Sequence, residues 1–232
     1  MDRFCDHLPP GADSSGRLLF SILFEIEWKK QGRLTGKRGK SVKKILVILG
    51  SPRKSGHTIQ MVETFLQPFR EKEDCQIDFF DTYQESPKPC IACGWCASHE
   101  ECAIHDSCDR LDRLLRECDL LVIASPIYNL SFPAPLKAVI DRFQRYFEAR
   151  FSMGIKPAIA KHRLAVLLLS AGTQCPEGES YMEKQLLQCF SVMNTTLHTT
   201  LSWMNTDKGE SGWKEAKLAL DRLSLAISRE MW

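Results

Sequence analysis

The sequence predicts an α/β fold in which helices cover both faces of one five-stranded parallel sheet. Short apolar runs, several of them rich in Val, Ile and Leu, are typical of strands that are buried on both faces. Amphipathic segments of helical length separate these runs, and such alternation indicates parallel strands joined by crossover helices. The expected strand order is 2-1-3-4-5, the flavodoxin-like order, although other doubly wound orders fit the same alternation.

The first half of the pattern begins at Ile45–Leu49, a continuous β-branched and apolar run that predicts a buried strand. A helix is expected over Thr58–Arg70, where apolar residues recur at helical spacing, and a second strand over Gln76–Phe80. The spacing of Leu111, Leu114 and Leu115 then predicts a helix from about Asp109.

The second half repeats the alternation after a third buried strand at Leu120–Ala124. The expected helices are Ala134–Phe147, Gly178–Met193 and Gly212–Met231, and the expected strands are Leu164–Leu169 and Thr196–Trp203. Together these elements predict a three-layer domain over residues 42–232, with a cysteine-rich insertion at 84–108. Trp203, Trp213, Tyr181 and the Leu-rich last helix are expected in the core or at a dimer surface.

Residues 1–41 differ from the rest in composition. Residues 1–44 hold ten Lys and Arg against five Asp and Glu, whereas the whole chain has a net charge of only +2. We expect a poorly ordered basic extension with one helix over Leu18–Trp28, or a translation start near Val42. A solvated linker explains the basic residues, and an acidic partner is the alternative.

The composition excludes several classes of protein. With 44% hydrophobic and 26% charged residues, the chain is neither collagen-like, a coiled-coil rod nor fully disordered. No run of about 18 uncharged apolar residues predicts a membrane span, and the mildly acidic body predicts no nucleic-acid surface. There is no convincing secretory signal, so we expect a reducing, cytoplasmic setting in which clustered cysteines serve metal or redox chemistry.

Three loops each begin at the carboxyl end of a predicted strand, namely 50–57, 125–132 and 170–178. Ligands of doubly wound sheets bind beyond the carboxyl ends of the strands, so these loops should converge on one site. The first loop leads into a helix N-terminus, which favours a phosphate, but an ordinary turn with Thr58 as N-cap fits as well. In the second loop Tyr128 can pack on a planar ring or lie in a plain surface turn.

Together the motifs resemble those of the flavodoxin-like NAD(P)H-dependent FMN reductases. The matching residues are Gly50-Ser51-Pro52-Arg53-x-x-Gly56-x-Thr58, Ser125-Pro126-x-Tyr128 and Leu136-Lys137-x-x-x-Asp141-Arg142. The resemblance covers roughly residues 43 to 205, and His57, where Asn is frequent, is a mild departure. It implies FMN, with NADH or NADPH as substrate. It also implies a homodimer or a higher homo-oligomer.

The resemblance assigns site residues position by position. The phosphate would be held by Ser51, Arg53, Ser55, Gly56, His57 and Thr58. The flavin would be lined by Pro126, Ile127, Tyr128 and Asn129, with Ser170 and Gly172 on its other side. Asp141 and Arg142 are expected to be structural or interfacial. No side chain is expected to act as a catalytic acid or base, because the flavin carries the chemistry.

A cysteine box is the second strong signal. Its spacing, Cys90-x2-Cys93-x2-Cys96-x5-Cys102, favours a 4Fe–4S cluster and resembles that of iron–sulfur flavoproteins within the same family. Free or redox-active thiols are an alternative, and zinc fits less well because it usually takes two separated pairs. Cys108 is a fifth nearby thiol, so the sequence does not assign the ligands uniquely.

Two functions of different classes follow. The first is an enzyme that passes electrons from NAD(P)H through FMN to a small-molecule or protein acceptor. The second is an iron–sulfur flavoprotein that relays single electrons between protein partners. A zinc- or thiol-based redox sensor without flavin is a third and weaker hypothesis.

Overall fold

The computed structural model describes residues 42–209 and 212–232, all within the unit Ser41–Trp232. The expectations for residues 1–41 lie outside the described residues. A five-stranded sheet with the order β2-β1-β3-β4-β5 forms the centre of this unit, and every neighbouring pair of strands is parallel. The predicted fold class and strand order are therefore confirmed.

Each strand contains its predicted run and extends it by one or two residues at one or both ends. The strands are β1 (Lys43–Leu49), β2 (Cys75–Asp81), β3 (Leu120–Pro126), β4 (Arg163–Ser170) and β5 (Thr195–Trp203). The extensions are polar or small residues at the edges of the apolar runs, where pairing with a neighbouring strand rather than burial decides the boundary.

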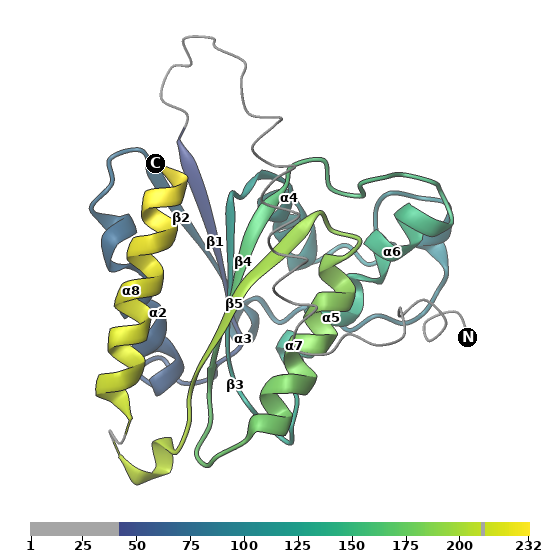
Figure 1. Ribbon diagram of the computed structural model, residues 1–232. Helices are drawn as coiled ribbons and strands as arrows, with labels where there is room; N and C mark the ends of the chain where they lie inside the picture. Colours follow the sequence, from purple (N-terminus) through teal and green to yellow (C-terminus); the bar gives the residue numbers. More distant parts are fainter. Residues whose placement is uncertain (1–41, 210–211) are drawn as a thin grey trace, which may run out of the picture. The chain divides into compact units, whose positions relative to one another are not determined.

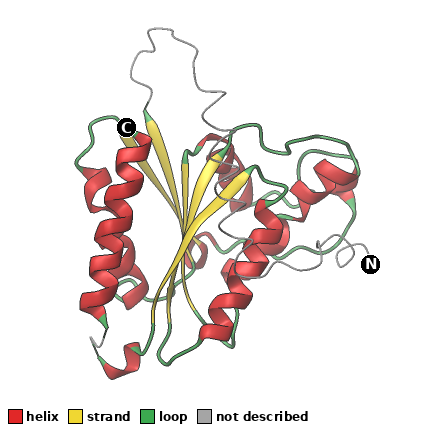
Figure 2. Cartoon of the chain, viewed as in Figure 1, coloured by secondary structure: helices red, strands yellow, loops and turns green. Residues whose placement is uncertain are grey.

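Helices cover the two faces of the sheet in two groups (Figures 1 and 2). Ile45 and Val47 of β1 pack in one core with α2 (His57–Arg70) and α8 (Trp213–Met231). Leu46 and Ile48 point to the opposite face, as the two-residue period of a strand requires. That face carries α4 (Ser107–Glu117), α5 (Ala134–Arg142), α6 (Gln144–Phe151) and α7 (Pro176–Phe190).

The helix predicted over Ala134–Phe147 is wrong as a single element, because the chain forms α5 and α6 with a break at Phe143. The Phe143 N–H donates to the carbonyl of Ile140 at 3.0 Å, three residues back, which tightens the last turn of α5. Phe143 and Tyr146 are both buried across the break. The apolar period therefore continues through the break, so the sequence pattern does not reveal it.

Other helix boundaries differ from the predictions by a few residues. α4 begins at Ser107 rather than near Asp109, because the Asp106 side chain accepts from the Cys108 N–H and caps the helix. α7 ends at Phe190, before the predicted Met193. Three short elements were not predicted, namely α3 (Thr82–Glu85), η1 (Trp95–Ala97) and η2 (Thr206–Lys208). In the described part of the chain, no helix is both long and apolar enough to cross a membrane.

Candidate functional site

The three predicted loops meet at the carboxyl ends of β1, β3 and β4, which we call the strand-end site. The Gly50 N–H donates to the Ala124 carbonyl at 2.8 Å, which joins the ends of β1 and β3. The Ile127 N–H donates to the Ser170 carbonyl at 2.9 Å, which joins the ends of β3 and β4. The expected convergence is therefore present in the structure.

The first loop leads into α2 without a side-chain cap. Gly56 is the N-cap residue, and no side chain of the described residues bonds to the helix N-terminus. The alternative with Thr58 as N-cap is wrong, because Thr58 lies inside the helix. The N–H groups of the first turn are thus free to bind an anion, and the helix dipole favours one.

The charged residues of this loop have different surroundings. Lys54 forms an ion pair with Asp81, the residue that caps α3 by accepting from the Tyr83 and Gln84 N–H groups. Arg53 is exposed, and within residues 42–209 and 212–232 it makes no ion pair. Arg53 is therefore the cation of the loop that remains available for a ligand, whereas Lys54 ties the loop to β2.

Three predicted phosphate residues face inward. The Thr58 hydroxyl is buried and lies 2.7 Å from the Ser170 hydroxyl, so the two residues bond to each other across the end of β3. The His57 ring meets the buried Trp203 edge-on, with ring centroids 4.6 Å apart. Ser51 is also buried, and its Oγ accepts from the Arg53 N–H at 3.3 Å. Ser55 is exposed and Gly56 half-buried beside the helix N-terminus.

The second loop presents an exposed aromatic side chain. Tyr128 and Ser131 exchange two backbone hydrogen bonds, and Asn129 between them has a positive φ of 50°. Tyr128 is 41% exposed, whereas Pro126 and Ile127 are partly buried. Burial raises the pKa of the nearby Tyr83, and Tyr128 raises it further, so the two phenols are neighbours. Sequence reasoning missed Tyr83 because it belongs to a four-residue helix on another strand end.

The third loop brings in a residue from beyond β5. The Asp207 N–H donates to the Gly172 carbonyl at 3.1 Å, and its carboxylate lies against the Gly172 Cα. A Cβ at position 172 would stand only 2.3 Å from Asp207 Oδ2, so any side chain there would force the Asp207 carboxylate to move. Nothing in the sequence pattern places Asp207 near Gly172, because the contact joins loops that follow different strands.

The cysteine box lies on a surface loop away from the strand ends. Cys90 and Cys93 are exposed, and Cys96 and Cys102 are partly buried. Burial raises the pKa of the Cys96 thiol, and Glu148, Cys102 and Cys90 raise it further. Within residues 42–209 and 212–232, no three His, Cys, Asp or Glu side chains are arranged to hold one metal ion. The thiols are thus near one another but are not gathered around a single point.

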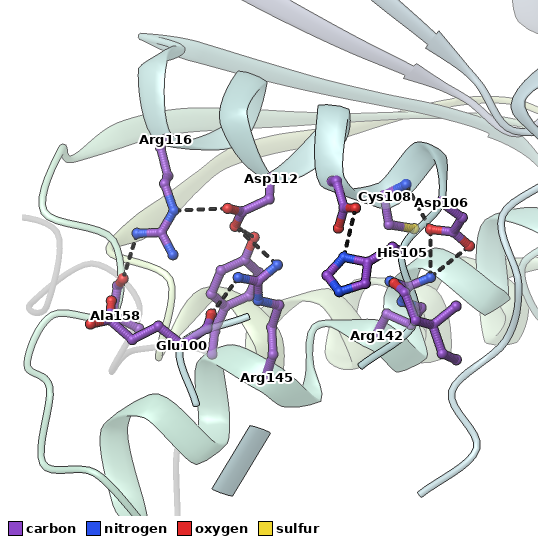
Figure 3. A network of polar contacts seen from close by, with 12 residues as sticks. Glu100, His105, Asp106, Cys108, Asp112, Arg116, Arg142, Arg145 and Ala158 are labelled. Atoms are coloured by element: carbon purple, nitrogen blue, oxygen red, sulfur yellow. Dashed lines mark hydrogen bonds and ion pairs between the residues drawn. The ribbon is translucent and has the colours of Figure 1, made fainter. Parts of the chain in front are cut away.

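A buried polar network supports this loop from α4, α5 and α6 (Figure 3). Tyr146 donates to Asp112 at 2.7 Å, and the same carboxylate pairs with Arg116 and Arg145. Burial, followed by the nearby Asp112, raises the pKa of Tyr146, so the phenol stays protonated as a donor. Arg142 is buried in an ion pair with Asp106, as expected for a structural residue. These contacts hold α4 against α5 and α6.

The family model of NADPH-dependent FMN reductases matches residues 43–207 of the chain. The chain belongs to this family. The resemblance found in the sequence is thereby confirmed, and the family supports FMN and a nicotinamide nucleotide as its cofactors.

Relatives of known name agree with this assignment. An iron–sulfur flavoprotein of Archaeoglobus fulgidus is 29% identical over 150 residues, which cover 65% of this chain and 64% of that protein. One of Methanosarcina thermophila is 34% identical over 99 residues, 43% of this chain and 51% of that protein. The match thus spans less than two thirds of either relative.

Solved structures support the fold. The NAD(P)H:quinone oxidoreductase of Methanothermobacter marburgensis superposes with a TM-score of 0.62 at 15% identity. The superposition covers 79% of this chain and 95% of that one. At this low identity the match shows a shared fold, and any activity must be argued from the residues of this chain.

Proposed function

We propose that the chain is an FMN-dependent oxidoreductase that accepts a hydride from NADH or NADPH and passes electrons to an acceptor. The observation that carries this proposal is the uncapped N-terminus of α2 beside Arg53, which is exposed and forms no ion pair with the described residues, at the carboxyl end of β1. A phosphate needs this combination of free N–H groups and positive charge, and so the residues present fit FMN. When bound, FMN supplies hydride chemistry that no side chain provides.

The remaining roles follow from the placement of the loops. Backbone N–H groups of the first turn of α2, with Arg53 and Ser55, would hold the phosphate. The exposed Tyr128 and Asn129 would bind the flavin ring from the second loop, and Gly172 would let the third loop approach it closely. Thr58 and Ser170 would hold the loops in place beneath the ligand, because their hydroxyls already bond to each other.

The electron-carrier function is the second candidate, and the cysteine box favours it. Four thiols lie on one loop, and the relatives described above are named iron–sulfur flavoproteins. The donor chemistry fits an iron–sulfur cluster, whereas the present placement of the thiols does not yet surround one. In this function electrons would reach a protein partner singly, and steady-state oxidation of NAD(P)H would be slow.

One experiment separates these functions. The full chain is purified without oxygen, its flavin and iron per chain are measured, and its oxidation of NADH and NADPH is followed with a quinone as acceptor. Flavin with rapid NAD(P)H oxidation supports the enzyme. Flavin and iron with turnover only from a reduced ferredoxin support the carrier. A colourless protein that binds no added FMN overturns both and favours the thiol or zinc sensor.

A matched pair of variants tests the phosphate site itself. Arg53→Gln removes the free cation beside the N-terminus of α2, whereas Arg70→Gln removes a cation that is paired with Glu63 at the other end of the helix. The loss of one charge-assisted contact should weaken FMN about tenfold in Arg53→Gln. Arg70→Gln should bind FMN like the wild type. Equal affinities in the two variants would place the phosphate elsewhere.

A further inference from the structure

The four box cysteines lie between two backbone groups that bond to one guanidinium. We call residues 89–103 the cysteine loop. Arg142 Nη2 donates to the Ile104 carbonyl at 2.7 Å, and Nη1 lies 3.5 Å from the Lys88 carbonyl. Lys88 immediately precedes the loop and Ile104 immediately follows it. A single side chain of α5 therefore holds both ends of the loop together.

Asp106 completes this junction. Both of its carboxylate oxygens lie 2.7 Å from Arg142 Nη1 (Figure 3). The same carboxylate accepts from the Lys88 and Cys108 N–H groups, each at 2.9 Å. The Arg142 side chain is 4% exposed and that of Asp106 is 12% exposed. Further hydrogen bonds offset the cost of burying such a pair, and here most of those bonds go to Lys88 and Ile104 at the loop ends.

The middle of the loop is held less firmly. Cys90 and Cys93 are exposed, and Ala92 and Gly94 between the thiols have positive φ angles of 52° and 74°. The contacts of this part include the bond that Arg145 donates to the Glu100 carbonyl and the stacked rings of Trp95 and His99, whereas other hydrogen bonds, such as that of Ala97 to Gly94, stay within the loop. In the described part of the chain the thiols do not surround one point, so the segment between the two clamped ends must rearrange to gather them.

We propose that Arg142 is a positioning residue for the cysteine box: it holds both ends of the cysteine loop against α5, so that the four thiols gather on an iron–sulfur cluster at a reduced entropic cost. A closed loop loses less conformational freedom when its ligands assemble than a loop with free ends does. The last step, binding of iron and sulfide, rests on the proposed electron-carrier function. The clamp itself does not.

An arginine is needed at position 142 because its partners lie in two different directions from the end of the side chain. Nη1 serves Asp106 while Nη2 serves the Ile104 carbonyl, and the planar fork of a guanidinium presents both N–H directions at once. A lysine keeps the charge but offers no fixed fork. The guanidinium also interacts electrostatically with the Cys102 and Cys108 thiols, so it places positive charge beside the box.

The test compares Arg142→Lys and Arg142→Met with the control Arg150→Met. Arg150 lies on α6 and donates to the Ser191 carbonyl at 2.8 Å, outside the cysteine loop. Each full-length protein is reduced and freed of metal, and the alkylation rate of each box cysteine by iodoacetamide is read by mass spectrometry. Without the clamp, alkylation of Cys102 should be about tenfold faster in both Arg142 variants. Arg150→Met should react like the wild type.

A second readout addresses the cluster. The same proteins are reconstituted with ferrous iron and sulfide without oxygen, and the loss of iron to a chelator is timed. Both Arg142 variants should lose iron about tenfold faster than the wild type, with FMN affinity unchanged. A role in general stability alone would not separate iron loss from FMN affinity in this way. If Arg142→Met fails to fold, Asp106→Asn takes its place, because it keeps the arginine and breaks the ion pair.

The outcomes distinguish the clamp formed by Arg142 from the binding of an iron–sulfur cluster. Wild-type alkylation and iron-loss rates in the Arg142 variants overturn the clamp. Faster alkylation in these variants, together with a wild-type protein that takes up no iron, keeps the clamp and overturns the cluster. Faster alkylation with unchanged iron loss shows that the clamp orders the loop but does not position the ligands, which overturns the proposal in its functional part.

Discussion

At the scale of single residues, buried hydroxyl groups organise the strand-end site. A buried Ser or Thr lies at or just beyond the carboxyl end of each of the five strands, and each hydroxyl has a partner within the protein. These groups satisfy polar atoms that would otherwise be buried without a partner at the strand ends. The residues are Ser51, Thr82, Ser125, Ser170 and Thr206. Their first role is therefore to fix the loops, before any ligand binds.

The bond between Thr58 and Ser170 leads to a prediction. Thr58→Val leaves the buried Ser170 hydroxyl without this partner, and we expect a loss of about 1–3 kcal/mol in the free energy of unfolding. Ser170→Ala should cost a similar amount. The double variant should cost less than the sum, because no orphaned hydroxyl remains. Urea unfolding of the FMN-free protein measures all three values.

FMN affinity distinguishes this bond from a direct phosphate contact. If the two hydroxyls act on each other, Thr58→Val and Ser170→Ala should weaken FMN to the same modest extent. A much larger loss in Thr58→Val than in Ser170→Ala would show that Thr58 binds the phosphate directly. Strictly additive effects on unfolding would show that the bond contributes nothing.

At the scale of elements, the N-terminus of α2 balances stability against binding. A side-chain cap at Gly56 would stabilise the helix, and Gly56→Asp and Gly56→Asn should cap it about equally well. Because a carboxylate repels the phosphate, Gly56→Asp should weaken FMN at least about tenfold more than Gly56→Asn does. A Cβ at this position would lie 3.1 Å from that of Arg53, a crowding that both variants share.

Calorimetry on the paired Gly56 variants measures both quantities. Thermal unfolding of the FMN-free proteins should give nearly equal midpoints, and titration with FMN should give different dissociation constants. Equal FMN affinities in Gly56→Asp and Gly56→Asn would mean that the phosphate does not bind at this helix end.

The elements also show what the sequence can predict. The strands followed from apolar runs such as Ile45–Leu49, because burial on both faces leaves a continuous apolar pattern. Their order did not follow from these runs alone, since other doubly wound orders fit the same alternation. The break at Phe143 did not, because its cause is a backbone hydrogen bond inside an unbroken apolar period. The uncapped end of α2 could not be predicted either, since Thr58 has the right side chain for a cap but turns it toward Ser170.

At the scale of the whole molecule, local signals placed the candidate site and long-range contacts completed it. Gly50–Thr58 and Ser125–Asn129 were found from the sequence because each motif is continuous in the chain. Asp207 against Gly172, and Arg142 against Asp106, join residues that are 35 and 36 positions apart in the sequence. Only the fold brings them together. Sequence reasoning therefore identified the parts of the site but not the contacts that hold them.

Those contacts predict which residues FMN binding will protect from hydrogen exchange. The loops at the carboxyl ends of the strands are joined to one another by the Gly50, Ile127 and Asp207 N–H bonds. FMN added to the FMN-free protein should therefore slow hydrogen exchange in residues 50–58, 126–132 and 170–178. It should do so in residues 203–208 as well, although no motif marks them, because Asp207 is bonded to Gly172.

The opposite end of the same sheet supplies the control. Segments 71–74, 118–119 and 191–194 precede β2, β3 and β5 and therefore lie at the amino ends of the strands, opposite the predicted ligand loops. Their exchange should not change beyond the uniform slowing that any ligand of the native state produces. Protection that includes 203–208 identifies the strand-end site as one connected unit. Protection confined to residues 50–58 would mean that the ligand contacts the phosphate loop alone and that the flavin ring lies outside the other loops.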